Sequence, residues 1–112
     1  MKNLTTYDFT AILTLLPTER GGRKRPAYDS YRPSFSFSSR NHFSGEISFP
    51  EDELVEPGST AMASVKLLPS RYIRQNLKSG DSFTILEGNQ LVGTGVIQEI
   101  LKEIKGSPKL PV

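Results

Sequence analysis

The feature that most constrains the fold of this chain is the alternation of apolar and polar side chains along short segments. In residues 7–16 every second side chain is apolar or aromatic, while Thr10 and Thr14 have the other parity. Successive side chains of a β-strand point to opposite faces of its sheet, so this period of two predicts a strand with one buried face. Similar short patterns predict strands at residues 34–38, 45–49 and 60–68, around Phe83 and Ile85, and at 91–101.

Glycine and proline separate these segments. Two glycines and a proline lie in residues 19–26, which we expect to form an exposed loop. Residues 87–90 predict the turn of a hairpin, and Gly93 and Gly95 share one face of the last strand, where another group can approach closely. About six short strands favour a barrel or a sandwich. Residues 71–78 are interpreted as a helical turn.

Length and cysteine content bound the architecture. The chain has 112 residues, the usual size of one domain. We expect one β-barrel domain at residues 1–106, with its core at about 7–102, and a loose tail at 107–112, which holds two prolines. Because the sequence has no cysteine, disulfides, thiolate metal sites and thiol nucleophiles are excluded.

Charge and hydropathy limit the partners. The 14 basic and 12 acidic residues give a net charge of +2, so a surface that attracts nucleic acid must be local. The N-terminus lacks the apolar segment of a signal peptide, and no apolar run reaches the roughly 18–20 residues that span a bilayer. We therefore expect a cytoplasmic protein with no membrane contact.

Four motifs, in this order, resemble the third, C-terminal domain of translation elongation factor Tu. They are Gly-Gly-Arg at residues 21–23, Tyr-Arg-Pro-Ser-Phe-Ser-Phe at 31–37, Glu-Gly at 87–88 and Val-Gly-Thr-Gly-Val at 92–96. The resemblance implies an all-β fold, a six-stranded antiparallel β-barrel. In elongation factor Tu this domain touches the T-stem of aminoacyl-tRNA, packs on the GTPase domain and contributes to binding of the exchange factor. The chain has no Gly-x-x-x-x-Gly-Lys-Ser/Thr loop, so we expect no GTP binding.

The resemblance also implies residues for an RNA contact. Arg23, Glu87 and Gly88 match T-stem contacts of the family, while Ser34 and Ser44 replace a glutamine and a threonine there. Arginines of the family are replaced by Ser38 and Gln90, which weakens the implied tRNA contact. The sequence adds neighbouring cations that can bind phosphates. The RNA-binding candidates are Arg23, Lys24, Arg25, Arg32, Ser34, Ser44, Glu87 and Gly88.

Each candidate has a structural interpretation as well. The basic loop can be a solvated surface, and Tyr31 with Arg32 can tie that loop to the barrel. The single histidine, His42, is interpreted as a loop residue, because a metal site needs further ligands. We find no nucleophile with a base, no acid–base pair and no metal-ligand set, so we expect no enzyme activity and no cofactor.

Three functions remain as hypotheses. The first in rank is a protein-binding module, a mimic or accessory of elongation factor Tu, which would bind an exchange factor, a GTPase-like partner or a toxin. Its candidate residues are Tyr72, Ile73 and Leu77, which form either an exposed apolar ridge or a cover over the barrel end. The alternative is a tRNA-binding module that uses the Gly-Gly-Arg loop, and the third hypothesis is an unrecognised enzyme.

Overall fold

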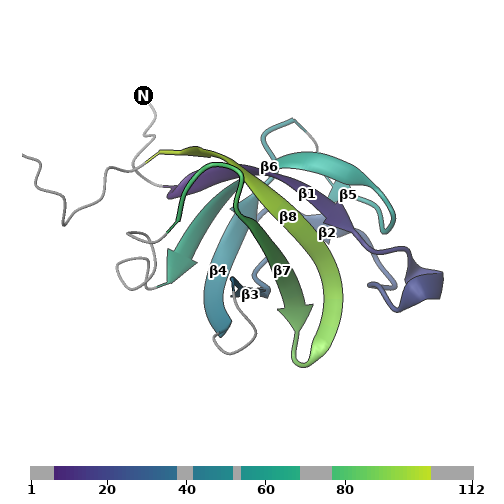
Figure 1. Cartoon of the computed structure of the whole chain (residues 1–112). Helices are drawn as coiled ribbons and strands as arrows, with labels where there is room; N and C mark the ends of the chain where they lie inside the picture. The colour runs from purple at the N-terminus through teal and green to yellow at the C-terminus, as the bar shows by residue number, and fades with distance from the viewer. Residues whose placement is uncertain (1–6, 38–41, 52–53, 69–76, 102–112) are drawn as a thin grey trace, which may run out of the picture.

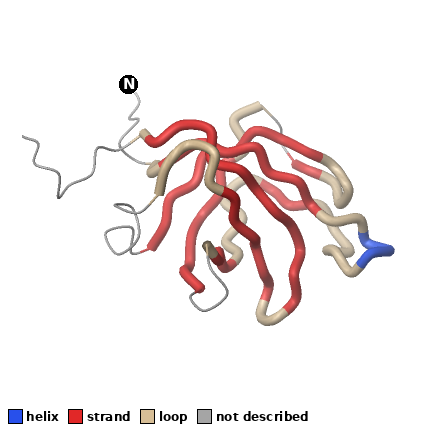
Figure 2. The backbone as a smooth tube through the Cα atoms, viewed as in Figure 1, coloured by secondary structure: helices blue, strands red, loops and turns tan. Residues whose placement is uncertain are grey.

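The structure, a computed structural model, describes residues 7–37, 42–51, 54–68 and 77–101. Within these ranges six strands form a closed barrel (Figure 1): β1 (Phe9–Leu15), β3 (Ser34–Ser36), β4 (His42–Ser48), β6 (Thr60–Leu68), β7 (Ser82–Glu87) and β8 (Gln90–Ile100). Two further strands, β2 (Ala27–Tyr28) and β5 (Leu54–Val55), pair with each other, and η2 (Thr18–Arg20) is a short 3-10 helix. Figure 2 shows that strands dominate the trace.

The barrel closes between its first and last strands. The strand order is β1-β6-β4-β3-β7-β8, every pair is antiparallel, and β8 pairs with β1. The predicted all-β, six-stranded antiparallel barrel is therefore confirmed. Among the described residues, none lies in a helix long and apolar enough to cross a membrane.

The inward side chains of the strands fill the barrel. Along β1 buried and half-buried residues alternate, as the period of two predicts. The centre of the core is aromatic: the rings of Phe9 and Phe35 both lie 5.7 Å from that of Phe83, between centroids. Gly95 faces this cluster, and a β-carbon there would lie 2.3 Å from the Phe83 ring. The expected close approach at Gly95 is thus confirmed, and the approaching group is an aromatic side chain.

Strand β8 carries two irregularities that the sequence pattern did not predict. Ile85 pairs with Gly93 but Leu86 pairs with Leu91, so β8 has one extra residue, Val92, against β7. The register between β8 and β1 also shifts, between Thr10 and Ala11 of β1, because β8 has another extra residue there. Extra residues of this kind bend a strand and increase its twist, which helps a six-stranded sheet to close.

Several sequence predictions need correction or lie outside the described residues. The β2–β5 pair was missed, because strands of two residues show no periodicity. His42, predicted in a loop, is the exposed first residue of β4. The predicted loop at residues 19–26 is only partly exposed, since it starts within η2 and Gly22 is buried. The tail at 107–112 and most of the predicted helical turn at 71–78 lie outside the described residues.

Candidate functional site

The Gly-Gly-Arg loop, residues 21–26, is held against the barrel by three groups. The hydroxyl of Thr18 donates a hydrogen bond to the carbonyl oxygen of Arg23 at 2.5 Å. The amide nitrogen of Gly22 donates to the carbonyl of Pro17 at 3.0 Å, and the side-chain amide of Gln90 donates to the carbonyl of Gly21 at 2.6 Å. A β-carbon at Gly22 would lie 2.1 Å from the carbonyl oxygen of Leu16, so only glycine fits there. The loop is therefore a fixed element of the structure.

The side chain of Arg23 folds back into the molecule. Its guanidinium donates to the Glu87 carboxylate through Nη1, to the Arg25 carbonyl through Nε at 3.0 Å and to the Pro26 carbonyl through Nη2 at 3.2 Å. The guanidinium carbon also lies 4.7 Å from the centre of the Tyr31 ring, a cation–π distance. Because only 20% of the Arg23 side chain is exposed, this cation mainly joins the loop to the β7–β8 hairpin.

Tyr31 completes this cluster. Its hydroxyl donates to Oε2 of Glu87, the same oxygen that accepts from Arg23. Burial and the hydrogen bond to Glu87 raise the pKa of Tyr31 well above its ordinary value of 10.0. Burial lowers the pKa of Arg23, but the interactions with Tyr31 and Glu87 outweigh burial and raise it overall. Arg23 thus stays cationic and Tyr31 stays a neutral donor over the ordinary pH range.

The exposed side of the loop carries the remaining charge. Lys24 and Arg25 are exposed, and with the hairpin they border a shallow recess of about 300 Å³. The recess is lined by Gly22, Arg23, Lys24, Arg25, Glu87 and Gln90. Gly88 is exposed at the tip of the hairpin with φ +62, the conformation that a tight two-residue turn needs at its first position.

The other RNA candidates lie on the adjoining strands. The side chain of Arg32 is 68% exposed, and its guanidinium lies 3.1 Å from the carboxylate of Glu46. Ser34 pairs across the strands with Ser44 on β4 and with Leu86 on β7, next to the hairpin cluster. The structure therefore gathers Arg23, Lys24, Arg25 and Glu87 around the recess, and places Ser34 and Ser44 on the paired strands β3 and β4. It also pairs Arg23 with Glu87 and Arg32 with Glu46.

The protein-binding candidates are only partly described. Leu77 is half-buried and packs against the core, which suits the interpretation as a cover over the barrel end. Tyr72 and Ile73 lie outside the described residues. Within the part of the chain that the structure describes, no three His, Asp or Glu side chains group as metal ligands would.

Sequence reasoning missed the anchors of the loop. Gln90 was considered only as a lost cation, yet its amide holds the Gly21 carbonyl. Glu46, the partner of Arg32, was not singled out either. The register of β3 with β4 could have suggested Glu46, because Ser34 pairs with Ser44 and Arg32 then falls opposite residue 46. The sequence carries no comparable signal for Gln90.

The comparison with models of protein families agrees with this geometry. Residues 3–101 match the model described as "Elongation factor Tu C-terminal domain". The match includes the loop, the hairpin and all six strands of the barrel.

Proposed function

The chain belongs to the elongation factor Tu C-terminal domain family, and we propose that it is a cytoplasmic, translation-related module that acts without catalysis by binding another protein. It would act as a mimic or accessory of elongation factor Tu. Its partner would be one that the family domain contacts, an exchange factor or a GTPase domain.

The pairing of Arg23 with Glu87 carries this proposal. RNA affinity comes largely from cations that neutralise phosphates and release counterions. Arg23 already has a carboxylate partner inside the module, and so has Arg32 in Glu46. Glu87, implied as a T-stem contact, is occupied by two donors. A surface on which Arg23, Arg32 and Glu87 already have partners favours a protein over a phosphate backbone.

The fixed loop also suits a protein interface. Lys24 and Arg25 project from a loop that is held at several points, so little conformational entropy is lost when they bind. Tyr28 follows in β2 with 57% of its surface exposed. Exposed tyrosine and arginine are the residue types that most often dominate protein interfaces. The partner surface should therefore be acidic beside an apolar pocket.

A tRNA contact is the second candidate, because Lys24 and Arg25 are exposed beside the recess. With about two free cations, the logarithm of the binding constant would fall with the logarithm of salt concentration with a slope of only about −2. Such a contact would be weak at physiological salt.

The test measures three partners in parallel. Labelled tRNA, the exchange factor and the isolated GTPase domain of elongation factor Tu are each titrated with the chain at several salt concentrations. We expect binding to one of the two proteins, weakened about tenfold or more by Tyr28→Ala and by Lys24→Ala/Arg25→Ala. Arg23 is left intact because the loop depends on it.

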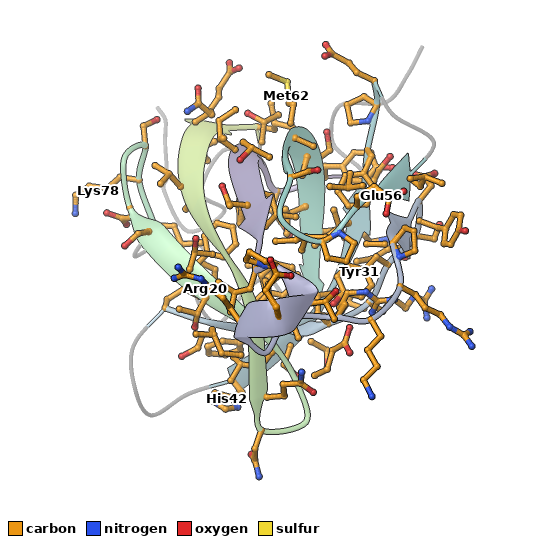
Figure 3. The ribbon with its side chains drawn as sticks, turned by 90° about the vertical axis from the view of Figure 1, so that its right-hand side faces the viewer. Arg20, Tyr31, His42, Glu56, Met62 and Lys78 are labelled. Carbon is orange, nitrogen blue, oxygen red and sulfur yellow. The ribbon has the colours of Figure 1, made fainter. Side chains whose placement is uncertain are left out.

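Lys78→Ala is the matched control. Lys78 is 80% exposed, and Figure 3 shows it at the opposite edge of the barrel from Tyr31. It should leave every affinity unchanged. Binding of tRNA alone, lost in Lys24→Ala/Arg25→Ala, would replace the protein proposal by the RNA one. Failure to bind any of the three would refute both.

A further inference from the structure

The recess beside the Gly-Gly-Arg loop contains charges of both signs. Among the described residues that line it, Glu87 carries a carboxylate, while Arg23, Lys24 and Arg25 carry cations. With a volume of about 300 Å³ the recess lies at the small end of ligand sites, and it can admit a single anionic group such as a phosphate. Three cations around such a space would attract a polyanion. What Glu87 does to that attraction therefore bears on which partner the recess can bind.

The Glu87 carboxylate takes the position of an anion beside Arg23. Its Oε2 accepts from Nη1 of Arg23 and from the hydroxyl of Tyr31. Arginine binds carboxylates and phosphates through the same planar fork of donors. The other two nitrogens of this fork, Nε and Nη2, donate to the carbonyls of Arg25 and Pro26. A phosphate that entered the recess would therefore compete with Glu87 for Arg23.

The position of Glu87 is fixed by the fold around it. Glu87 is the last residue of β7 and pairs with Gln90 across the hairpin turn. Its second donor, Tyr31, is held by a bridge to Ile47, whose amide nitrogen donates to the carbonyl of Tyr31 at 2.8 Å. If the carboxylate turned away, Arg23 and Tyr31 would both lose this acceptor. The negative charge therefore stays at the recess when another molecule approaches.

A fixed carboxylate discriminates between classes of partner. The side chain of Glu87 is 36% exposed, so an approaching molecule meets its charge. A phosphodiester group offers acceptors and no donor, so beside Glu87 it would meet repulsion without a hydrogen bond. A protein can place an acidic side chain beside Lys24 and Arg25 and a lysine or an amide beside Glu87. Only the protein can then match both kinds of charge.

From this geometry we propose that Glu87 is a specificity-determining residue, which excludes phosphate backbones from the recess and so selects a protein partner. The resemblance to the family implies Glu87 as an RNA contact, and its pairing with Arg23 gives it the opposite effect in this chain. The inference rests on the proposed function in one respect, that the recess is part of the surface that binds the partner.

The first experiment titrates the full chain against a short labelled RNA duplex at several salt concentrations. We expect the wild type to bind weakly, with a slope of about −2 for the logarithm of the binding constant against that of salt concentration, from Lys24 and Arg25. Glu87→Gln keeps an acceptor oxygen but removes the charge. It should bind about tenfold tighter at low salt, and its slope should steepen to about −3, because Arg23 becomes a third free cation.

Two control variants separate the charge of Glu87 from other effects. Glu99→Gln makes the same change in net charge, but Glu99 is exposed at the far end of β8 from the hairpin. It should bind the duplex like the wild type. Tyr31→Phe removes one donor to Glu87 and loosens the cluster without changing any charge. This variant should not gain affinity for the duplex.

Two further variants test the location of the gain and protect the result from a failure to fold. Adding Lys24→Ala and Arg25→Ala to Glu87→Gln should remove the tighter binding, because all of these residues line the recess. Glu87→Ser removes the same charge with a smaller side chain, so it should show the same steeper slope. Circular dichroism spectra like that of the wild type would show that each variant is folded.

Three results would overturn the proposal. They are an affinity and slope in Glu87→Gln equal to those of the wild type, an equal gain in Glu99→Gln, and an equal gain in Tyr31→Phe. The duplex titrations use no protein partner, so their outcome is independent of whether the exchange factor or the GTPase domain binds. A gain in Glu87→Gln would support the role of Glu87 even if both proteins failed to bind.

Discussion

Arg23 donates a hydrogen bond to Glu87, a residue 64 positions further along the chain. The pair joins the Gly-Gly-Arg loop near the start of the barrel to the hairpin that leads into its last strand. Both residues were implied as contacts for RNA, and the structure gives each of them a partner within the protein. The pair therefore has consequences for stability that can be measured without any ligand.

Removing the Glu87 charge should loosen this cluster. In Glu87→Gln the partly buried guanidinium of Arg23 would lose its counter-charge, and Tyr31 would lose its ionised acceptor. We expect the free energy of unfolding to fall by about 1–2 kcal/mol, since the pair is partly screened by water. Urea denaturation measures this change.

The control for that experiment is Glu46→Gln. Glu46 also pairs with an arginine, but the Arg32 side chain is 68% exposed. Exposed ion pairs contribute between about 0 and 1 kcal/mol, so this variant should unfold almost like the wild type. Equal losses in the two variants would contradict the role given to the Arg23–Glu87 pair.

Stability should fall at alkaline pH because of Tyr31. Its pKa is raised in the folded state by burial and by the hydrogen bond to Glu87. Above the ordinary value of 10.0 the unfolded chain loses the phenol proton while the folded protein keeps it, so rising pH favours unfolding. Thermal melts at increasing alkaline pH should show this decline, and it should be smaller in Tyr31→Phe. An unchanged slope in that variant would assign the decline to other groups.

Gly95→Ala should strain the aromatic core. The added methyl would lie 2.3 Å from the Phe83 ring, which is enclosed by other phenylalanines. Overpacking of this kind costs about 1–3 kcal/mol, measured by denaturation. Adding Phe83→Leu should recover part of the loss, because the smaller side chain leaves room for the methyl. If the stability losses of the two single variants simply add in the double variant, the clash with the Phe83 ring is not the cause of the loss in Gly95→Ala.

Gln90→Ala should release the loop while leaving the barrel intact. The variant removes the donor that holds the Gly21 carbonyl at 2.6 Å. We expect faster amide hydrogen exchange in residues 21–26, with exchange in β1 and β6 unchanged. Exchange that stays slow in the loop would mean that the Arg23 cluster alone is sufficient to hold it.

The sequence predicted the parts of this fold that follow from local pattern. The alternation of Phe9, Ala11 and Leu13 indicated a half-buried strand, and the spacing of Phe83 and Ile85 indicated another. The closed, six-stranded antiparallel barrel came from the resemblance to the family, and the order of its strands was not predicted. Periodicity could not supply it, because alternation along one strand does not name its neighbours.

The remaining features depend on contacts between distant residues. The extra residue Val92 in β8 leaves the local pattern almost unchanged and shows only in the register with β7. Arg23, Tyr31 and Glu87 are each ordinary surface residue types, and contacts between distant segments bring them together: β3, which follows Tyr31, pairs with β7, and Gln90 holds the loop that carries Arg23. The sequence shows that Arg23 and Glu87 are charged. It does not show whether each charge has a partner within the protein.

The pairing of β1 with β8 also governs how the chain folds during synthesis. Strand β1 emerges from the ribosome before the other strands of the barrel, but one of its two neighbours is the last strand of the barrel. Until β8 has emerged, β1 has an open edge and Phe9 lacks its cross-strand partner Ile100. Barrels whose contacts are so distant in sequence fold slowly, in milliseconds to seconds. The nascent chain therefore completes this barrel as one late event, and it exposes an unpaired strand edge to chaperones until then.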